Sequence, residues 1–289
     1  MQLYHKRSLL LSLMYCFFTS VSVAQCDSTA YKQAITFYQK QQFDSAITSC
    51  TQQIRICPFA QVYVERAFCY YNLKKKTEAF KDFHSAAAIT NNKTESLFRT
   101  GNILFNIKQY NDAFTFYHEV SEIIPSRSDA WYRMARCKWL ERLDILKANH
   151  VEDFSKDPVL MSGLKNEIMR YYDKAINLDS VANYQKYISR PEIEAINDMQ
   201  SNYTFYSDRA MFRLNFGDFA GGLKDIKMAN KIHPVIENYR TAAYLAKKVG
   251  EKDNACTYMQ KWATMFSPSE NIDPVKKREE ADKFCKELK

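Results

Sequence analysis

Glycine and proline are scarce in this chain of 289 residues, which contains six glycines and seven prolines. An all-β fold needs many tight turns, where these two residues are concentrated, so their scarcity argues against strands as the main element. It also argues against a glycine-rich loop that binds phosphate, and no G-x-G-x-x-G segment occurs. Hydrophobic residues at 46% and charged residues at 26% exclude a disordered chain and allow a large core.

Recognisable catalytic motifs are also missing. The sequence has no H-E-x-x-H, no G-x-S-x-G and no C-x-x-C segment, so it lacks the spacings of zinc peptidases, serine hydrolases and thioredoxin-like proteins. We therefore predict that the protein is not an enzyme, that it uses no cofactor and that it has no metal site.

The N-terminus has the pattern of an export signal. Positive residues at 5–7 precede an apolar run over 9–18, and the small residues Ser22 and Ala24 mark a cleavage site. We expect residues 1–24 to be removed and the mature chain to be secreted or periplasmic, without a transmembrane span. Two alternatives stay open. The first is a retained N-terminal anchor, and the second is a lipoprotein anchored through Cys26, whose preceding residues resemble a bacterial lipobox except at Gln25.

The positive charge is modest and scattered. Cleavage would remove Lys6 and Arg7, lowering the formal net charge of +8 by two. The remaining basic clusters at 74–76, 247–248 and 276–278 form no continuous stripe, so we predict no nucleic-acid partner.

The most informative feature is an internal repeat that begins at 27, 60, 94, 128, 203 and 236. Its period is 33–34 residues except between 128 and 203, where the step is 75. Its eighth position carries only small residues: Ala34, Ala67, Gly101, Ala135, Ala210 and Ala243. Its twentieth position does the same where the period is regular: Ala46, Ala79, Ala113, Gly222 and Ala255. Two antiparallel helices in each repeat need small residues where their axes cross, and large apolar residues above and below.

This pattern resembles the tetratricopeptide repeat. The resemblance covers most of 27–269 and implies an all-α fold: an α-solenoid, here a right-handed superhelix of helix-turn-helix repeats, with a C-terminal capping helix. We divide the chain into a signal peptide (1–24), N-terminal repeats (25–140), an expanded fourth repeat with two inserts (141–202), C-terminal repeats (203–269) and a cap (270–289). The N-terminal part contains repeats 27–59, 60–93 and 94–127 and the first helix of the fourth.

The cap is predicted from its start signal, in which Asp273 precedes Pro274. An apolar face is expected on the helix that follows: Val275, Ala281, Phe284, Cys285 and Leu288. Since export permits disulfides, we predict a Cys256–Cys285 bond between the cap and the last repeat. Cys50–Cys69 and Cys26–Cys57 are further candidate pairs.

The resemblance also implies where a partner binds. In the family, a concave groove is lined by particular positions of the first helices. Carried over to this chain, the partner-binding positions are Tyr31, Tyr38, Phe68, Tyr71, Phe98, Asn102, Phe105, Asn106, Tyr132, Arg136 and Trp139. Aromatic and arginine side chains are common at binding hot spots. The competing interpretation is that these aromatics only pack the helix pairs.

The resulting hypothesis is an exported, non-catalytic scaffold that binds another protein or peptide segment of unknown identity through its groove. One alternative is a binding module for an envelope glycan or acidic polymer, because aromatic rings stack on sugars. A third hypothesis is an enzyme with its site in the 141–202 inserts.

Overall fold

The structure is a computed structural model that describes residues 28–151, 153–187, 192–265 and 273–288, with residues 155 and 180–202 described by backbone alone. The signal peptide predicted at 1–24 and the lipidation candidate Cys26 lie outside the described residues. None of the helices in the described ranges is long and apolar enough to cross a membrane.

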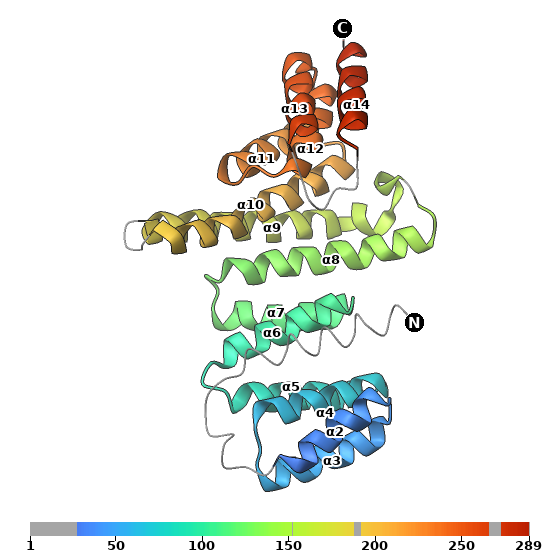
Figure 1. The fold of residues 1–289 in the computed structure, drawn as a ribbon, viewed down its shortest axis with the longest axis vertical. Coiled ribbons are helices and arrows are strands. Elements are labelled where there is room, and N and C mark those ends of the chain that lie inside the picture. The colour runs from blue at the N-terminus through green and yellow to red at the C-terminus, as the bar shows by residue number, and fades with distance from the viewer. Residues whose placement is uncertain (1–27, 152, 188–191, 266–272, 289) are drawn as a thin grey trace. The chain divides into compact units, whose positions relative to one another are not determined.

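Helices account for the secondary structure of the described residues, which include no strand. The chain divides within α6 (Lys93–Asn106) into two compact units, one ending at Asn102 and one beginning at Ile103. The first unit contains α2 (Thr29–Gln39), α3 (Phe43–Ile56), α4 (Ala60–Asn72) and α5 (Lys76–Ala88), drawn in blue to cyan in Figure 1. In this unit α2 packs on α3, α3 on α4 and α4 on α5.

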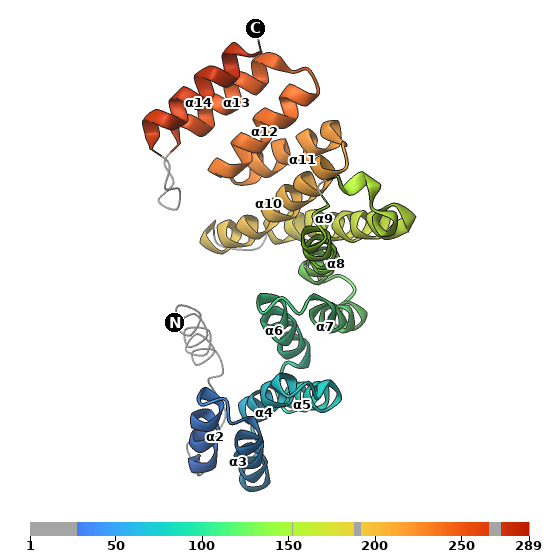
Figure 2. The same cartoon turned by 90° about the vertical axis from the view of Figure 1, so that its right-hand side faces the viewer.

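The second unit continues the same arrangement. Consecutive helices pack in chain order from α7 to α14, and α10 also contacts α12. The long helices α8 and α9 lie side by side in Figure 1, and α12, α13 and α14 form adjacent rods in Figure 2. The bounds are α7 (Tyr110–Ile123), α8 (Ser128–Ala148), α9 (Lys165–Tyr187), α10 (Glu192–Asn215), α11 (Phe219–Ile232), α12 (Ile236–Lys248), α13 (Lys252–Thr264) and α14 (Pro274–Lys286).

The small repeat residues lie in the core, as the sequence pattern predicts. The alanines of both rows are at most 2% exposed. At Gly222, an added Cβ would come within 3.3 Å of the backbone oxygen of Ala210, so α10 and α11 cross too closely there for a larger residue. The predicted all-α array of tetratricopeptide-like helix pairs is therefore confirmed.

The expanded fourth repeat lengthens its helices. Helices α8, α9 and α10 have 21, 23 and 24 residues, whereas the other α-helices have 11 to 14. Between α8 and α9 the chain makes a 3₁₀ turn (Phe154–Lys156) and a π-turn (Leu160–Leu164). The Arg142 guanidinium pairs with the buried Asp157 carboxylate, which also accepts a 2.7 Å hydrogen bond from the Leu160 backbone N–H. These contacts fasten the first insert to α8.

The capping helix α14 begins as expected, because the Asp273 side chain accepts a hydrogen bond from the Val275 backbone N–H. Ala281, Phe284 and Leu288 pack into the core of the last repeats. Val275 does not join that apolar face: it is 60% exposed, because it lies in the first turn of α14, and this part of the prediction was wrong.

The Cys256–Cys285 disulfide is present and joins α13 to α14, which confirms that prediction. The predicted Cys50–Cys69 bond is wrong, because both are free thiols that are fully buried in α3 and α4 and serve there as small apolar core residues. Burial raises the pKa of the Cys69 thiol to about 12, so it holds little reactive thiolate. Cys57 is disulfide-bonded, and its predicted partner Cys26 lies outside the described residues.

Candidate functional site

The predicted partner-binding aromatics of the first unit lie between helices. Tyr31, Phe68 and Tyr71 are buried, and Tyr38 is half-buried. Three of the rings make edge-to-face contacts with neighbours: Tyr31 with Phe59 at 5.1 Å, Tyr38 with Phe43 at 5.7 Å, and Phe68 with Phe83 at 5.2 Å. These rings stabilise the helix pairs and leave little area for a ligand.

The predicted residues on α6 divide between core and surface. Phe98 and Phe105 are buried, Asn102 is half-buried and Asn106 is exposed. In the second unit the Phe105 ring packs edge-to-face on Tyr110 at 5.3 Å. The guanidiniums of Arg133 and Arg136 lie over the same ring at 5.4 and 5.0 Å.

The structure brings Tyr132 and Arg136 of α8 together around a residue that sequence reasoning did not single out, Asp208 of α10. The Tyr132 hydroxyl donates a 2.8 Å hydrogen bond to Asp208 Oδ2, and Arg136 Nε lies 3.1 Å from the same oxygen. Burial and the Asp208 charge both raise the pKa of the Tyr132 phenol, so it stays a hydrogen-bond donor at neutral pH. The Arg136 and Asp208 side chains remain about one-third exposed, at 31% and 35%.

Trp139, the last predicted residue, is buried. Its ring makes edge-to-face contacts with Phe154 of the insert at 5.6 Å and with Phe212 of α10 at 5.0 Å. Because Phe154 belongs to the 3₁₀ turn, Trp139 holds the insert against α8 and α10, and little of its ring faces solvent.

Two exposed apolar side chains lie on the C-terminal first helices. Met211 of α10 is 44% exposed and Tyr244 of α12 is 43% exposed. Both occupy the ninth position of their repeats, the position that Arg136 fills on α8. The Thr241 hydroxyl lies 3.8 Å from the Met211 sulfur and one turn from Tyr244. We call the surface formed by Arg136, Asp208, Met211, Thr241 and Tyr244 the first-helix face.

Sequence reasoning missed Met211 and Tyr244, because the last two repeats carry polar residues at most of the carried-over positions. The ninth repeat position could have identified them. Large side chains at that position should have been noted in every repeat, and not mainly in the aromatic-rich N-terminal half.

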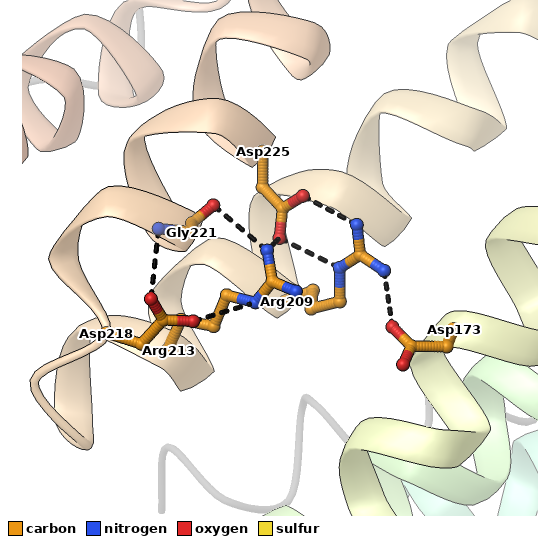
Figure 3. Close-up of polar contacts among 6 residues, drawn as sticks. All are labelled: Asp173, Arg209, Arg213, Asp218, Gly221 and Asp225. Atoms are coloured by element: carbon orange, nitrogen blue, oxygen red, sulfur yellow. Dashed lines mark hydrogen bonds and ion pairs between the residues drawn. The ribbon is translucent and has the colours of Figure 1, made fainter.

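Buried arginine–aspartate pairs hold these helices in place. Arg209 donates hydrogen bonds of 2.8 and 2.6 Å to the Asp225 carboxylate of α11, and a third of 2.5 Å to Asp173 of α9. Arg213 donates to the same Asp225 at 2.9 Å (Figure 3). Asp225 is only 2% exposed, so the network is a structural link that fixes α9, α10 and α11 beneath the first-helix face.

The first unit contains an equivalent pair. Arg66 Nε and an Arg66 terminal nitrogen donate to the Asp82 carboxylate at 2.7 and 2.8 Å, and its other terminal nitrogen donates to Thr51 of α3 at 2.9 Å. Arg66 and Arg209 share the seventh repeat position, and Asp82 and Asp225 share the twenty-third. The pairing was therefore readable from the repeat alignment, although sequence reasoning did not identify it.

The charged residues of α12 beside the first-helix face are paired with α14. Arg240 contacts Glu280 at 2.6 Å and Lys247 contacts Glu287 at 3.2 Å. Tyr244 lies between these two pairs and meets the Phe284 ring edge-to-face at 5.5 Å. Within the described residues, no group of three or more His, Cys, Asp or Glu side chains is placed to hold a metal ion.

No family model and no curated protein matches the sequence. Solved structures match in fold at low identity. The MamA protein is 14% identical with a TM-score of 0.45, over 78% of this chain and 94% of that one. PilF of Pseudomonas aeruginosa is 13% identical with a TM-score of 0.45, over 89% and 96%. PilW, described as a type IV pilus biogenesis factor, is 14% identical with a TM-score of 0.46, over 87% and 97%. Similarities of this size assign the chain no function.

Proposed function

We propose that the protein is a non-catalytic scaffold that binds a segment of another protein across the first-helix face. The observation that carries this proposal is the pair of exposed apolar side chains, Met211 and Tyr244, at equivalent positions of neighbouring first helices. Large apolar side chains held at the surface of a helical array offer contact area to a partner. Among the carried-over residues, Arg136 contributes directly to this face, and Tyr132 supports it through Asp208.

The aromatic residues of the first unit that the repeat resemblance predicts to bind a partner have a structural role in this proposal. Since Tyr31, Phe68 and Tyr71 are each less than one-tenth exposed, they stabilise the array, and the second unit supplies the exposed contacts.

We also propose that the scaffold works outside the cytoplasm. The signal-like N-terminus supports export, and the Cys256–Cys285 disulfide is of the kind that persists in oxidising compartments. Mass spectrometry of the mature N-terminus tests this: a chain that begins at Gln25 agrees with cleavage, whereas a diacylated Cys26 would replace the secreted form with a lipoprotein.

Site-specific photo-crosslinking in cells tests the binding role. A benzophenone amino acid replaces Tyr244 on the first-helix face. In the matched control it replaces Met228, which is 40% exposed on α11, the second helix of its repeat. We expect a discrete protein adduct from position 244 and none from position 228. Equal adducts from both positions, or none from either, would contradict a scaffold that binds through this face.

A further inference from the structure

The first-helix face continues as a strip into the cap. The Met211 sulfur contacts Thr241, Thr241 precedes Tyr244 by one helical turn, and the Tyr244 ring contacts Phe284 of α14. Single exposed apolar residues are ordinary on protein surfaces, but here the exposed Met211 and Tyr244 are connected through Thr241, and the Tyr244 ring lies against Phe284 of α14, which is itself buried. We call the row of Met211, Thr241, Tyr244 and Phe284 the apolar strip.

The charges along this strip are already paired within the chain. Asp208 is bound by Arg136, Arg240 by Glu280, and Lys247 by Glu287. The Lys247 ammonium also lies 4.9 Å from the centre of the Phe284 ring. Glu237 lies one turn before Thr241 and adds a negative charge at the edge. Among the described residues, Arg136, Arg240 and Lys247 along the strip are therefore each already paired with a carboxylate.

We propose that the apolar strip binds a protein segment whose contacting side chains are large and apolar and which carries no acidic residue at the contact. The inference rests on the proposed function and specifies the chemistry of the partner. An acidic peptide or acidic polymer would have to displace Glu280 or Glu287 from its cation, and would meet Glu237. An apolar side chain needs neither step, because Met211 and Tyr244 are open to solvent beside the neutral Thr241.

The direct test uses a phage-displayed library of random peptides, selected on the purified mature chain. Binders are synthesised with a fluorophore, and their affinities are measured by anisotropy at low and high salt. We expect selected peptides to be rich in Leu, Phe, Met or Tyr and poor in Asp and Glu, and to bind with little salt dependence. The Met211→Ala/Tyr244→Ala variant should lower their affinity by about tenfold or more.

The matched control is Met228→Ala, which removes an equally exposed methionine from α11 and should leave affinity unchanged. Circular dichroism checks that the double variant folds. The single variant Met211→Ala removes less of the strip and tests the same contact with less risk of misfolding. If peptides bind the double variant as tightly as the wild type, or if the selected peptides are acidic and salt-sensitive, this inference fails while the scaffold function stands. If no peptide binds and no crosslink forms at position 244, both fail.

Discussion

The Arg209 guanidinium and the Asp225 carboxylate face each other through two parallel hydrogen bonds of 2.8 and 2.6 Å. Their helices, α10 and α11, form one repeat, and the remaining terminal nitrogen of Arg209 reaches Asp173 in the helix before them. One side chain therefore connects three helices, and Arg66 has the same position relative to Asp82 in the second repeat.

Removal of Asp225 should be severely destabilising. Asp225→Ala leaves two arginines that are mostly buried without their shared carboxylate, and breaking a buried pair of this kind costs about 3–5 kcal/mol. Urea unfolding followed by circular dichroism gives the change in the free energy of unfolding. Asp218→Ala is the control: its side chain is 51% exposed, and the substitution removes an exposed ion pair worth about 1 kcal/mol or less and an N-cap hydrogen bond from Gly221 worth about 1 kcal/mol. If the two variants lose the same free energy of unfolding, the Asp225 network contributes no more to stability than an exposed contact does.

Enlarging a small residue at a helix crossing should also destabilise the array. Ala113 of α7 is completely buried, so Ala113→Leu has to push neighbouring helices apart at a cost of about 1–3 kcal/mol. The control, Ala220→Leu, changes an exposed position on α11 and should have little effect. Thermal unfolding compares the two, and wild-type stability in Ala113→Leu would contradict the helix-pair packing.

Glu65 should make stability depend on pH. It is 5% exposed in α4, it accepts a 3.1 Å hydrogen bond from the Gln61 amide, and burial raises the pKa of its carboxyl above the usual value. Below the pKa of the unfolded state the carboxyl is neutral in both states. As the pH rises through the higher folded pKa, the native state has to bury a charge, so stability falls.

The Glu65→Gln variant should therefore increase the free energy of unfolding at pH 7, by about 1–3 kcal/mol, and change it little well below pH 4. Urea titrations at both pH values measure the difference. The exposed Glu78→Gln in α5 serves as the control, because it neutralises a carboxyl that is not buried. A Glu65→Gln effect that is the same at both pH values would contradict burial of an ionisable carboxyl.

The disulfide of the cap gives a further prediction. Cys256 and Cys285 are 29 residues apart, and closing a loop of this length is worth about 3–4 kcal/mol in the chain-entropy view. The Cys256→Ser/Cys285→Ser variant should unfold at a lower temperature than the wild type, and a reducing agent should lower its melting temperature less than that of the wild type, because only the disulfide of Cys57 remains to be reduced. The Cys137→Ser variant, which removes a free buried thiol, should keep the response of the wild type. The prediction would be contradicted if adding reductant left the melting temperature of the wild type unchanged.

The repeat made most of the fold predictable, because the small residues at equivalent positions report directly on where helices cross. Ala67 and Ala243 could be assigned to crossings from spacing alone, and Asp273 with Pro274 fixed the start of α14. The Cys256–Cys285 pairing followed from the same register. The Cys50–Cys69 pairing failed because register places two residues near each other without saying whether the thiols are oxidised.

The candidate site was less predictable. The carried-over positions identify first-helix residues, but they do not state how much of each side chain its neighbours cover. Trp139 is covered because the insert folds Phe154 back onto it, and that contact depends on a turn with no repeat period. Met211 and Tyr244 are exposed, and the residues beside them, Thr241 and Asn215, are short and polar.

The bridge from Arg209 to Asp173 and Asp225 affects how the array comes apart as well as how it holds together. A repeat array whose neighbours touch only through apolar surfaces can lose its helices one pair at a time from an end. Here, withdrawing α11 leaves Arg209 and Arg213 of α10 without Asp225, and withdrawing α9 leaves Arg209 without Asp173. These three helices should therefore open as one cooperative block, with their amides protected from hydrogen exchange to a common extent.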